Sequence, residues 1–182
     1  AAVDKHREEF MADYEKDERP FVISHPGSPL TQLPARDGIA HGSIQRSNKF
    51  PNCSFFRNWT STKDSITWTA EVGESGTYEV ILYYAAKDAG AKCELSFNDS
   101  MLKFEIREAH DVPELGAEHD RYARQESYVK NFKSIPIGRI DLQQGVGTMR
   151  LSATEIPGRE AMEFRLLTLE RVEDPNGASC DD

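Results

Sequence analysis

Short stretches in which apolar and polar residues alternate run through most of this chain. In residues 65–72, SITWTAEV, every second residue is apolar, and residues 77–85, TYEVILYYA, repeat the pattern. A period of two is typical of half-buried β-strands, because successive side chains point to opposite faces of a sheet. Shorter runs of the same kind follow over 93–97, 102–106, 135–142, 149–153 and 162–172. The residues expected in the core are Trp68, Tyr78, Val80, Leu82, Tyr84, Leu95, Phe97, Phe104, Leu151 and Phe164.

Turn residues divide these runs at short intervals. Glu74-Ser75-Gly76, Asn98-Asp99-Ser100 and Pro157-Gly158 are turn sequences between alternating segments. About eight short strands with turns at this spacing predict a mainly β fold, a two-sheet antiparallel β-sandwich or jelly roll, over residues 43–173. No βαβ alternation and no G-x-G-x-x-G motif is present, which argues against Rossmann and P-loop chemistry.

The N-terminal part has a different pattern. Val3, Phe10, Met11 and Tyr14 fall on one face at helical spacing, so residues 1–19 are predicted to form an amphipathic helix. The remaining segments are an extended Pro/Gly-rich connector over 20–42 and a disordered tail over 174–182.

Charge excludes one class of partner. The chain has 22 basic and 31 acidic residues, so its net charge is 22 − 31 = −9. An acidic chain without a Lys/Arg-rich run repels a phosphate backbone, so we expect no nucleic acid partner. No apolar run approaches the roughly 20 residues that span a bilayer, so we expect no membrane partner, and the first residues lack the apolar core of a signal peptide.

The three cysteines carry little information. Cys53, Cys93 and Cys180 have no C-x-x-C spacing, so neither a disulfide framework nor a thiolate zinc site is predicted. One bridge between Cys53 and Cys93 stays open, and two small buried hydrophobic side chains are the default expectation.

A long polar insertion over 107–131 holds the candidate charged ligands. His119, Asp120 and Arg121 could bind a metal ion or an anion, whereas a solvated loop with local ion pairs is the simpler interpretation. If the insertion binds anionic sugars, the donors are Arg121, Arg124 and Lys130, because guanidinium forks match sulfate or carboxylate oxygens. The competing interpretation is that the arginines pair with neighbouring acids and only fasten the loop.

Three aromatic residues outside the predicted core are candidates for stacking on a sugar. Tyr122 and Tyr128 lie in the insertion, and Trp59 lies in a polar stretch before a strand. Each of the tyrosines could either contact a ligand or order the insertion over one end or face of the sandwich. The histidines show no i, i+4 pairing, and G-x-S-x-G and H-E-x-x-H are missing, so we predict no catalytic site.

Several segments together resemble known protein families. Residues 76–85, GTYEVILYYA, resemble a strand of galactose-binding-like jelly rolls, notably family 6 and family 35 carbohydrate-binding modules. Four further segments resemble the region that follows the catalytic domain in bacterial sulfatases, of the arylsulfatase or N-acetylgalactosamine-6-sulfatase type common in Planctomycetes. These segments are 31–38, 51–56, 58–62 and 119–130, within a similarity that runs from about Arg19 to Leu169.

The resemblance implies a non-catalytic accessory module that binds glycans, sulfated ones among them, and targets an upstream sulfatase catalytic domain. The alternative is a structural domain that packs on that catalytic domain and completes its cleft without affinity of its own. Modules of these families often hold a structural calcium ion, which leaves calcium open here with no ligands assigned. The resemblance also implies a periplasmic or secreted location.

Overall fold

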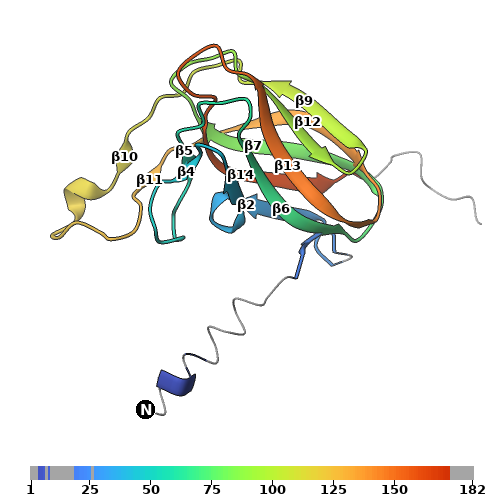
Figure 1. Ribbon diagram of the computed structural model, residues 1–182, viewed down its shortest axis with the longest axis horizontal. Helices are drawn as coiled ribbons and strands as arrows, with labels where there is room; N and C mark the ends of the chain where they lie inside the picture. The colour runs from blue at the N-terminus through green and yellow to red at the C-terminus, as the bar shows by residue number, and fades with distance from the viewer. Residues whose placement is uncertain (1–3, 7, 9–18, 26, 173–182) are drawn as a thin grey trace, which may run out of the picture.

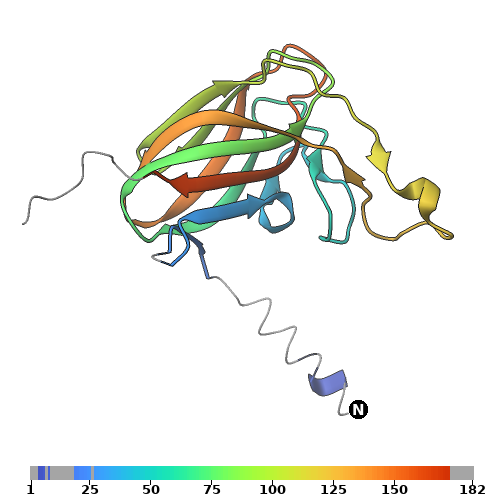
Figure 2. The same cartoon turned by 180° about the vertical axis from the view of Figure 1, so that it is seen from behind.

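The computed structural model describes residues 4–6, 8, 19–25 and 27–172, and it is a mainly β structure. Two sheets pack face to face as a β-sandwich, which confirms the predicted fold class (Figures 1 and 2). Almost all strand pairs are antiparallel, and β1 with β6 is the parallel exception. The principal strands are β6 (Ser65–Val72), β7 (Gly76–Ala85), β8 (Lys92–Phe97), β9 (Ser100–Glu105), β12 (Lys133–Leu142), β13 (Gly145–Glu155) and β14 (Glu163–Arg171).

Each sheet combines strands from distant parts of the chain. The first sheet has the order β1-β6-β13-β8-β9, with β3 also paired to β6. The second has the order β12-β7-β14-β5-β4, with β2 also paired to β14. The edge strands β9 and β12 therefore lie next to each other where the two sheets meet (Figure 1). The shorter strands are β1 (Phe21–Ile23), β2 (Leu30–Pro34), β3 (Ile39–His41), β4 (Gln45–Arg46) and β5 (Phe56–Arg57).

The alternation of the sequence places the core as expected. Trp68 and Tyr84 are each 1% exposed, and the Trp68 ring meets the edge of Phe164 with the ring centroids 5.6 Å apart. Of the predicted core residues, Phe104 alone is only half-buried. Its strand β9 is an edge strand, so its inward side chain faces the seam between the sheets rather than the closed interior.

The segment expected to be an extended connector, 20–42, is part of the sandwich. It contributes β1 and β3 to the first sheet and β2 to the second. The sandwich thus begins at Phe21 rather than at residue 43. Local periodicity could not reveal these strands, because each has only three to five residues and its pairing partner lies far along the chain.

A single arginine fastens this segment. The Arg46 guanidinium donates hydrogen bonds to the carbonyl oxygens of Ala35 at 3.2 Å and of Arg36 at 2.8 Å, and to Ser54 Oγ at 3.1 Å. The same group stacks over the ring of Phe56, 5.1 Å from its centroid. These contacts close the short 3₁₀ turn at Ala35–Asp37 against the loop that leads into β5.

Both ends of the chain are described only in part. Asp4–His6 and Glu8 are helical, in keeping with one short N-terminal helix. The rest of the predicted amphipathic stripe, and the predicted tail at 174–182, fall outside the described residues. Among the residues that are described, no helix is long and apolar enough to cross a membrane.

The two described cysteines are free thiols, so the Cys53–Cys93 bridge does not form. Cys93 is 1% exposed on an inward position of β8, and burial raises its thiol pKa to about 12. It behaves as a small hydrophobic residue. Cys53 is only half-buried, at a loop position with a φ of 56°.

Candidate ligand-binding site

The insertion over 107–131 forms an arm that projects beside one end of the sandwich. It carries a two-stranded ladder of β10 (Glu114–Leu115) and β11 (Val129–Lys130), with a 3₁₀ turn at Ala117–His119 between them. Figures 1 and 2 both show the arm extending outward, next to the loop that joins β4 and β5. The insertion was expected over one end or face of the sandwich; it lies at one end and projects outward without covering a face of either sheet.

A nearly buried ion pair anchors the base of the arm. Lys130 Nζ lies 2.6 Å from Glu163 Oε2 on β14, and the two side chains are only 11% and 14% exposed. The ammonium group also lies 5.3 Å from the centroid of the Phe55 ring. The hydroxyls of Ser47 and Ser127, 2.6 Å apart, join the arm to the neighbouring loop. Lys130 thus has a structural role, and its ammonium group is not offered to a ligand.

Arg124 also has its partners within the arm. Its guanidinium donates two hydrogen bonds to the Asp120 carboxylate, at 2.5 and 3.1 Å, and stacks over the Tyr128 ring at 5.2 Å. The hydrogen bond from Arg124 lowers the pKa of Asp120, and the same bond raises the pKa of Arg124. For this arginine, the structure favours the interpretation that it only fastens the loop.

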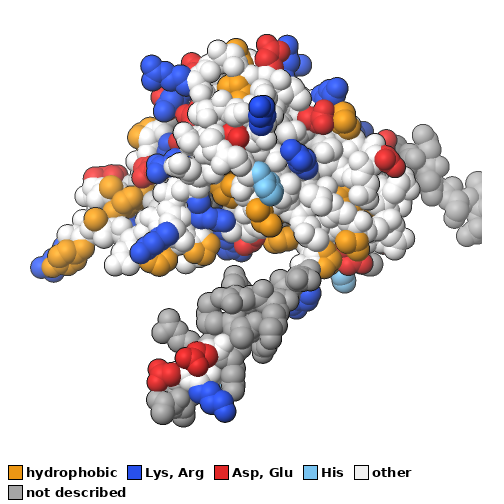
Figure 3. Space-filling model, in the orientation of Figure 1, with side chains coloured by type: hydrophobic (Ala, Val, Ile, Leu, Met, Phe, Trp, Pro, Cys, Tyr) orange, Lys and Arg blue, Asp and Glu red, His pale blue; other side chains and the backbone are white. Residues whose placement is uncertain are grey.

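The aromatic residues predicted to stack on a sugar differ in their exposure to solvent. Trp59 is completely buried, so its ring cannot stack on a ligand, and that prediction is wrong. Tyr122 is 78% exposed and does not order the arm, and the Arg121 guanidinium lies 5.7 Å from its ring centroid. Figure 3 shows hydrophobic and basic side chains next to each other along the arm. His119 is exposed, and its Nε2 atom lies 3.5 Å from Glu118 Oε1.

Of the predicted site residues, Asp120, Arg124 and Tyr128 contact one another within the arm, whereas Trp59 is buried and Lys130 is paired with Glu163. Within residues 4–6, 8, 19–25 and 27–172, no three His, Cys, Asp or Glu side chains are placed to hold a metal ion together.

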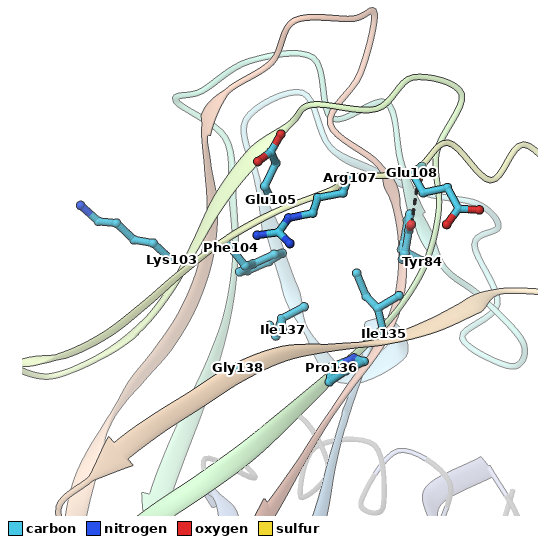
Figure 4. A pocket seen from close by; sticks show the side chains of 10 residues that line it. All are labelled: Tyr84, Lys103, Phe104, Glu105, Arg107, Glu108, Ile135, Pro136, Ile137 and Gly138. Atoms are coloured by element: carbon cyan, nitrogen blue, oxygen red, sulfur yellow. Dashed lines mark hydrogen bonds between the residues drawn. The ribbon is translucent and has the colours of Figure 1, made fainter.

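A pocket that the sequence did not reveal opens between the edge strands β9 and β12. Its volume is about 510 Å³, and Figure 4 shows Phe104, Ile135 and Ile137 between the two strands, whereas Lys103 and Glu105 extend away from them. The floor is apolar and the rim is charged. The lining residues are Tyr84, Lys103, Phe104, Glu105, Arg107, Glu108, Ile135, Pro136, Ile137 and Gly138.

The floor exists because three inward-facing apolar side chains are incompletely covered. Phe104, Ile135 and Ile137 pack against the core, yet each remains partly exposed. The register of β12 shifts between Pro136 and Gly138, which interrupts regular pairing at this level. Gly138 has a φ of 130°, a conformation that L side chains rarely adopt, and this glycine carries the chain through the irregularity.

The approach of β12 to β9 at this point also requires a glycine. A Cβ atom at Gly138 would lie 2.9 Å from Leu102 Cδ1 on β9, closer than non-bonded carbon atoms approach. A side chain at this position would push the strands apart and change the shape of the pocket floor.

The segment that forms the upper rim is held on both sides. Ile106 exchanges backbone hydrogen bonds with Gly90 and Ala91, and His110 exchanges two with Ala86. Between them, the Tyr84 hydroxyl donates to the Glu108 carbonyl oxygen at 2.8 Å, the bond drawn in Figure 4. Burial, as the largest cause, raises the pKa of Tyr84, so the phenol stays protonated and can donate.

Of the two rim acids, Glu108 has a lysine partner, and Glu105 only faces one that is bound elsewhere. Lys133 Nζ lies 2.5 Å from Glu108 Oε2, and this hydrogen bond lowers the pKa of Glu108. Glu105 lies opposite Lys92 on the neighbouring strand. The pKa of Lys92 is raised first by its hydrogen bond to Glu155 and further by the charge of Glu105.

The side chain of Arg107, at the rim, is exposed and has no hydrogen-bond or ion-pair partner in the described part of the chain. Figure 4 shows it running across the mouth of the pocket above Phe104. The sequence offered one weak signal, because Arg107 directly follows the alternating run that ends at Ile106.

Comparison with known proteins bears on the fold. No protein-family model and no curated protein matches the sequence. A family 35 carbohydrate-binding module from Clostridium thermocellum has a TM-score of 0.52 at 14% identity, covering 80% of this chain and 100% of that one. The C-terminal family 6 module of LamC, a marine laminarinase from Zobellia galactanivorans, has a TM-score of 0.55 at 7% identity, covering 78% and 99%.

A larger enzyme contains a similar module. A GH26-CBM35 β-(1,4)-mannanase from Podospora anserina has a TM-score of 0.56 at 15% identity, covering 80% of this chain and 28% of that chain. The chain thus spans the length of isolated modules and a minor part of the multidomain enzyme. At these identities, the comparison shows a shared β-sandwich fold.

Proposed function

We propose that this chain is a non-catalytic accessory module that binds glycans, with one sugar residue held in the pocket between β9 and β12. The observation that carries the proposal is the composition of this pocket. A partly exposed apolar floor of Phe104, Ile135 and Ile137 lies beneath a rim of charged side chains. Its fold, which resembles that of carbohydrate-binding modules, adds support.

The pocket suits the two-sided chemistry of a pyranose. One face of the ring carries C–H groups that pack on an aromatic or aliphatic surface, and the hydroxyl groups at its edge need hydrogen-bond partners. Phe104 and the two isoleucines supply the first surface. Arg107, at the mouth of the pocket, supplies donors. A pocket of about 510 Å³ is large enough for one sugar residue with its neighbours outside.

The proposal includes a parent enzyme. The four segments that resemble the region after a sulfatase catalytic domain support an upstream domain of that kind. In this arrangement the module holds the enzyme on its polymer, the polymer carries sulfate groups, and both act in the periplasm or outside the cell.

The experiment is an affinity screen of the chain against neutral, carboxylated and sulfated polysaccharides, with calorimetry for each hit. Phe104→Leu keeps an apolar side chain but removes the flat ring, and we expect it to weaken binding at least fivefold. Met101→Ala is the matched control, because Met101 lies on the same strand with its side chain 55% exposed on the opposite face. Equal affinities of the two variants would place the ligand elsewhere.

The alternative, a structural domain that packs on the catalytic domain, has one observation in its favour. Val22 and Val146 both neighbour Glu71 on the outer face of the first sheet, and they are 49% and 62% exposed. Ile39, on β3 of the same sheet, is 59% exposed. A folded wild-type chain that binds no polysaccharide of the panel would favour this alternative.

A further inference from the structure

Among the cations of the pocket and the arm, Arg107 and Arg121 have no acid partner in the described part of the chain, and only Arg107 lies at the pocket; Lys103 Nζ lies 4.0 Å from Glu94 Oε2. Lys133 is paired with Glu108, Lys130 with Glu163, and Arg124 with Asp120. The charges of these three cations are therefore neutralised by acids of the chain itself. Among the residues that the structure describes, Arg107 makes no such contact, although its side chain lies at the mouth of the pocket between β9 and β12.

The backbone around Arg107 is fixed before any ligand arrives. The backbone hydrogen bonds of Ile106 and His110 hold the segment on either side, and the Tyr84 hydroxyl holds the carbonyl of the next residue. A ligand would therefore have to order only the side chain of Arg107. This reduces the entropic cost of binding, because the main chain loses no freedom.

We propose that Arg107 makes this pocket selective for sugars that carry an anionic substituent, a sulfate ester or a carboxylate. The inference rests on the proposed glycan-binding function. The guanidinium donates a forked pair of hydrogen bonds to two oxygens of the substituent, while the sugar ring packs over Phe104. The fork fits a planar carboxylate and one face of a sulfate equally well, so both sources share the same recognition chemistry.

Because the whole chain is acidic, a site for an anionic sugar needs a basic side chain within the site itself. With a net charge of −9, the chain repels polyanions at long range. Arg107 at the mouth of the pocket supplies a positive charge that attracts an anion at short range, because the nearby Glu108 is already paired with Lys133. Arginine is better suited than lysine, because its two donors fix the orientation of the substituent.

The test compares three kinds of oligosaccharide made of galactose derivatives or its uronic acid: neutral agarose oligosaccharides, sulfated κ-carrageenan oligosaccharides and carboxylated oligogalacturonates. Calorimetry at two salt concentrations measures their affinities for the wild-type chain, Arg107→Ala and Arg107→Lys. We expect Arg107→Ala to weaken binding of an anionic oligosaccharide at least tenfold and that of the neutral one less than twofold. Arg107→Lys keeps the charge without the fork, so we expect an intermediate loss.

Arg150→Ala is the matched control for net charge. Arg150 is exposed on the outer face of the first sheet and has no ion pair among the described residues. If Arg107→Ala and Arg150→Ala lose the same affinity for the anionic oligosaccharides, the effect comes from the net charge of the chain, and the inference is wrong. Loss confined to carrageenan identifies a sulfate ester, and loss confined to oligogalacturonate identifies a carboxylate.

The two proposals can fail separately. If Phe104→Leu weakens binding of an anionic oligosaccharide while Arg107→Ala does not, the pocket binds glycans but Arg107 does not select them. Wild-type binding of the neutral oligosaccharide alone would overturn the selectivity in the same way. If the folded wild-type chain binds none of the three, the selectivity for anionic sugars is wrong, and the broader polysaccharide panel decides whether the chain binds glycans at all. All of these variants change exposed or partly exposed side chains, and thermal unfolding confirms that each is folded.

Discussion

Replacing Lys130 with methionine tests whether this lysine anchors the arm or serves a ligand. The change removes the ammonium group and keeps an unbranched apolar stem of similar length over the Phe55 ring. It leaves the Glu163 carboxylate, with a side chain only 14% exposed, without its partner 2.6 Å away. The main effect of the substitution is therefore an unpaired acid in a poorly hydrated position.

The magnitude follows from the burial of the pair. Removing one partner of a fully buried ion pair costs about 3–5 kcal/mol. Because roughly a tenth of each side chain reaches solvent and the arm can relax, we expect about 2–4 kcal/mol. The double variant Lys130→Met/Glu163→Leu removes both charges, and we expect it to lie within about 1 kcal/mol of the wild type.

Urea unfolding followed by tryptophan fluorescence measures these differences. With a slope of about 2 kcal/mol per molar urea, the single variant should unfold about 1–2 M earlier. Lys92→Met is the matched control, because its pair with Glu155 is equally short at 2.5 Å but both side chains are 55% exposed. We expect its unfolding midpoint to stay close to that of the wild type, because solvent screens an exposed pair. If the two single variants lose the same stability, or the double variant loses the sum of its parts, the anchoring role is refuted.

Three further predictions concern the core, the thiols and the arm. Trp68→Ala should cost about 3–5 kcal/mol in urea unfolding, because the side chain is almost wholly buried; a loss below about 1 kcal/mol would contradict its place in the core. With its pKa raised to about 12, Cys93 should resist iodoacetamide at pH 8 while Cys53 reacts, as peptide mass spectrometry would show, and equal rates would contradict the burial. The folded pKa of Asp120 is lowered, so its bond to Arg124 contributes fully above the unfolded pKa and is lost as pH falls through the folded one. NMR titration should place the Asp120 midpoint below the ordinary value of about 3.9, and a midpoint at or above that value would contradict the pair.

Residue contacts show why the candidate site could only partly be predicted from the sequence. The sequence predicted that basic side chains of the insertion donate hydrogen bonds to an anionic ligand. A basic side chain pairs instead with any acid that the fold brings within reach. Arg124 meets Asp120 four residues earlier in the sequence, so that pairing was foreseeable as the alternative. Lys130 meets Glu163, 33 residues away, and nothing local predicts this contact.

The pocket depends on tertiary structure still more strongly. Phe104 and Ile135 both have the inward parity of core residues, and parity alone predicts that they are buried. Their partial exposure arises because β9 and β12 are the edge strands of different sheets and meet at the seam. Sheet order is set by long-range pairing, so the same pattern in central strands would have given a closed core.

By itself, the sequence determined the fold class, the principal strands and almost all of the expected core. A period of two along a strand is a local property, and burying one face of it requires a second sheet. Only the tertiary structure decided that residues 21–41 belong to the sandwich, that Trp59 is buried, and that Arg107 lies unpaired over an apolar floor. These outcomes depend on which distant segments lie side by side, and contacts between such segments leave no periodic trace in the chain.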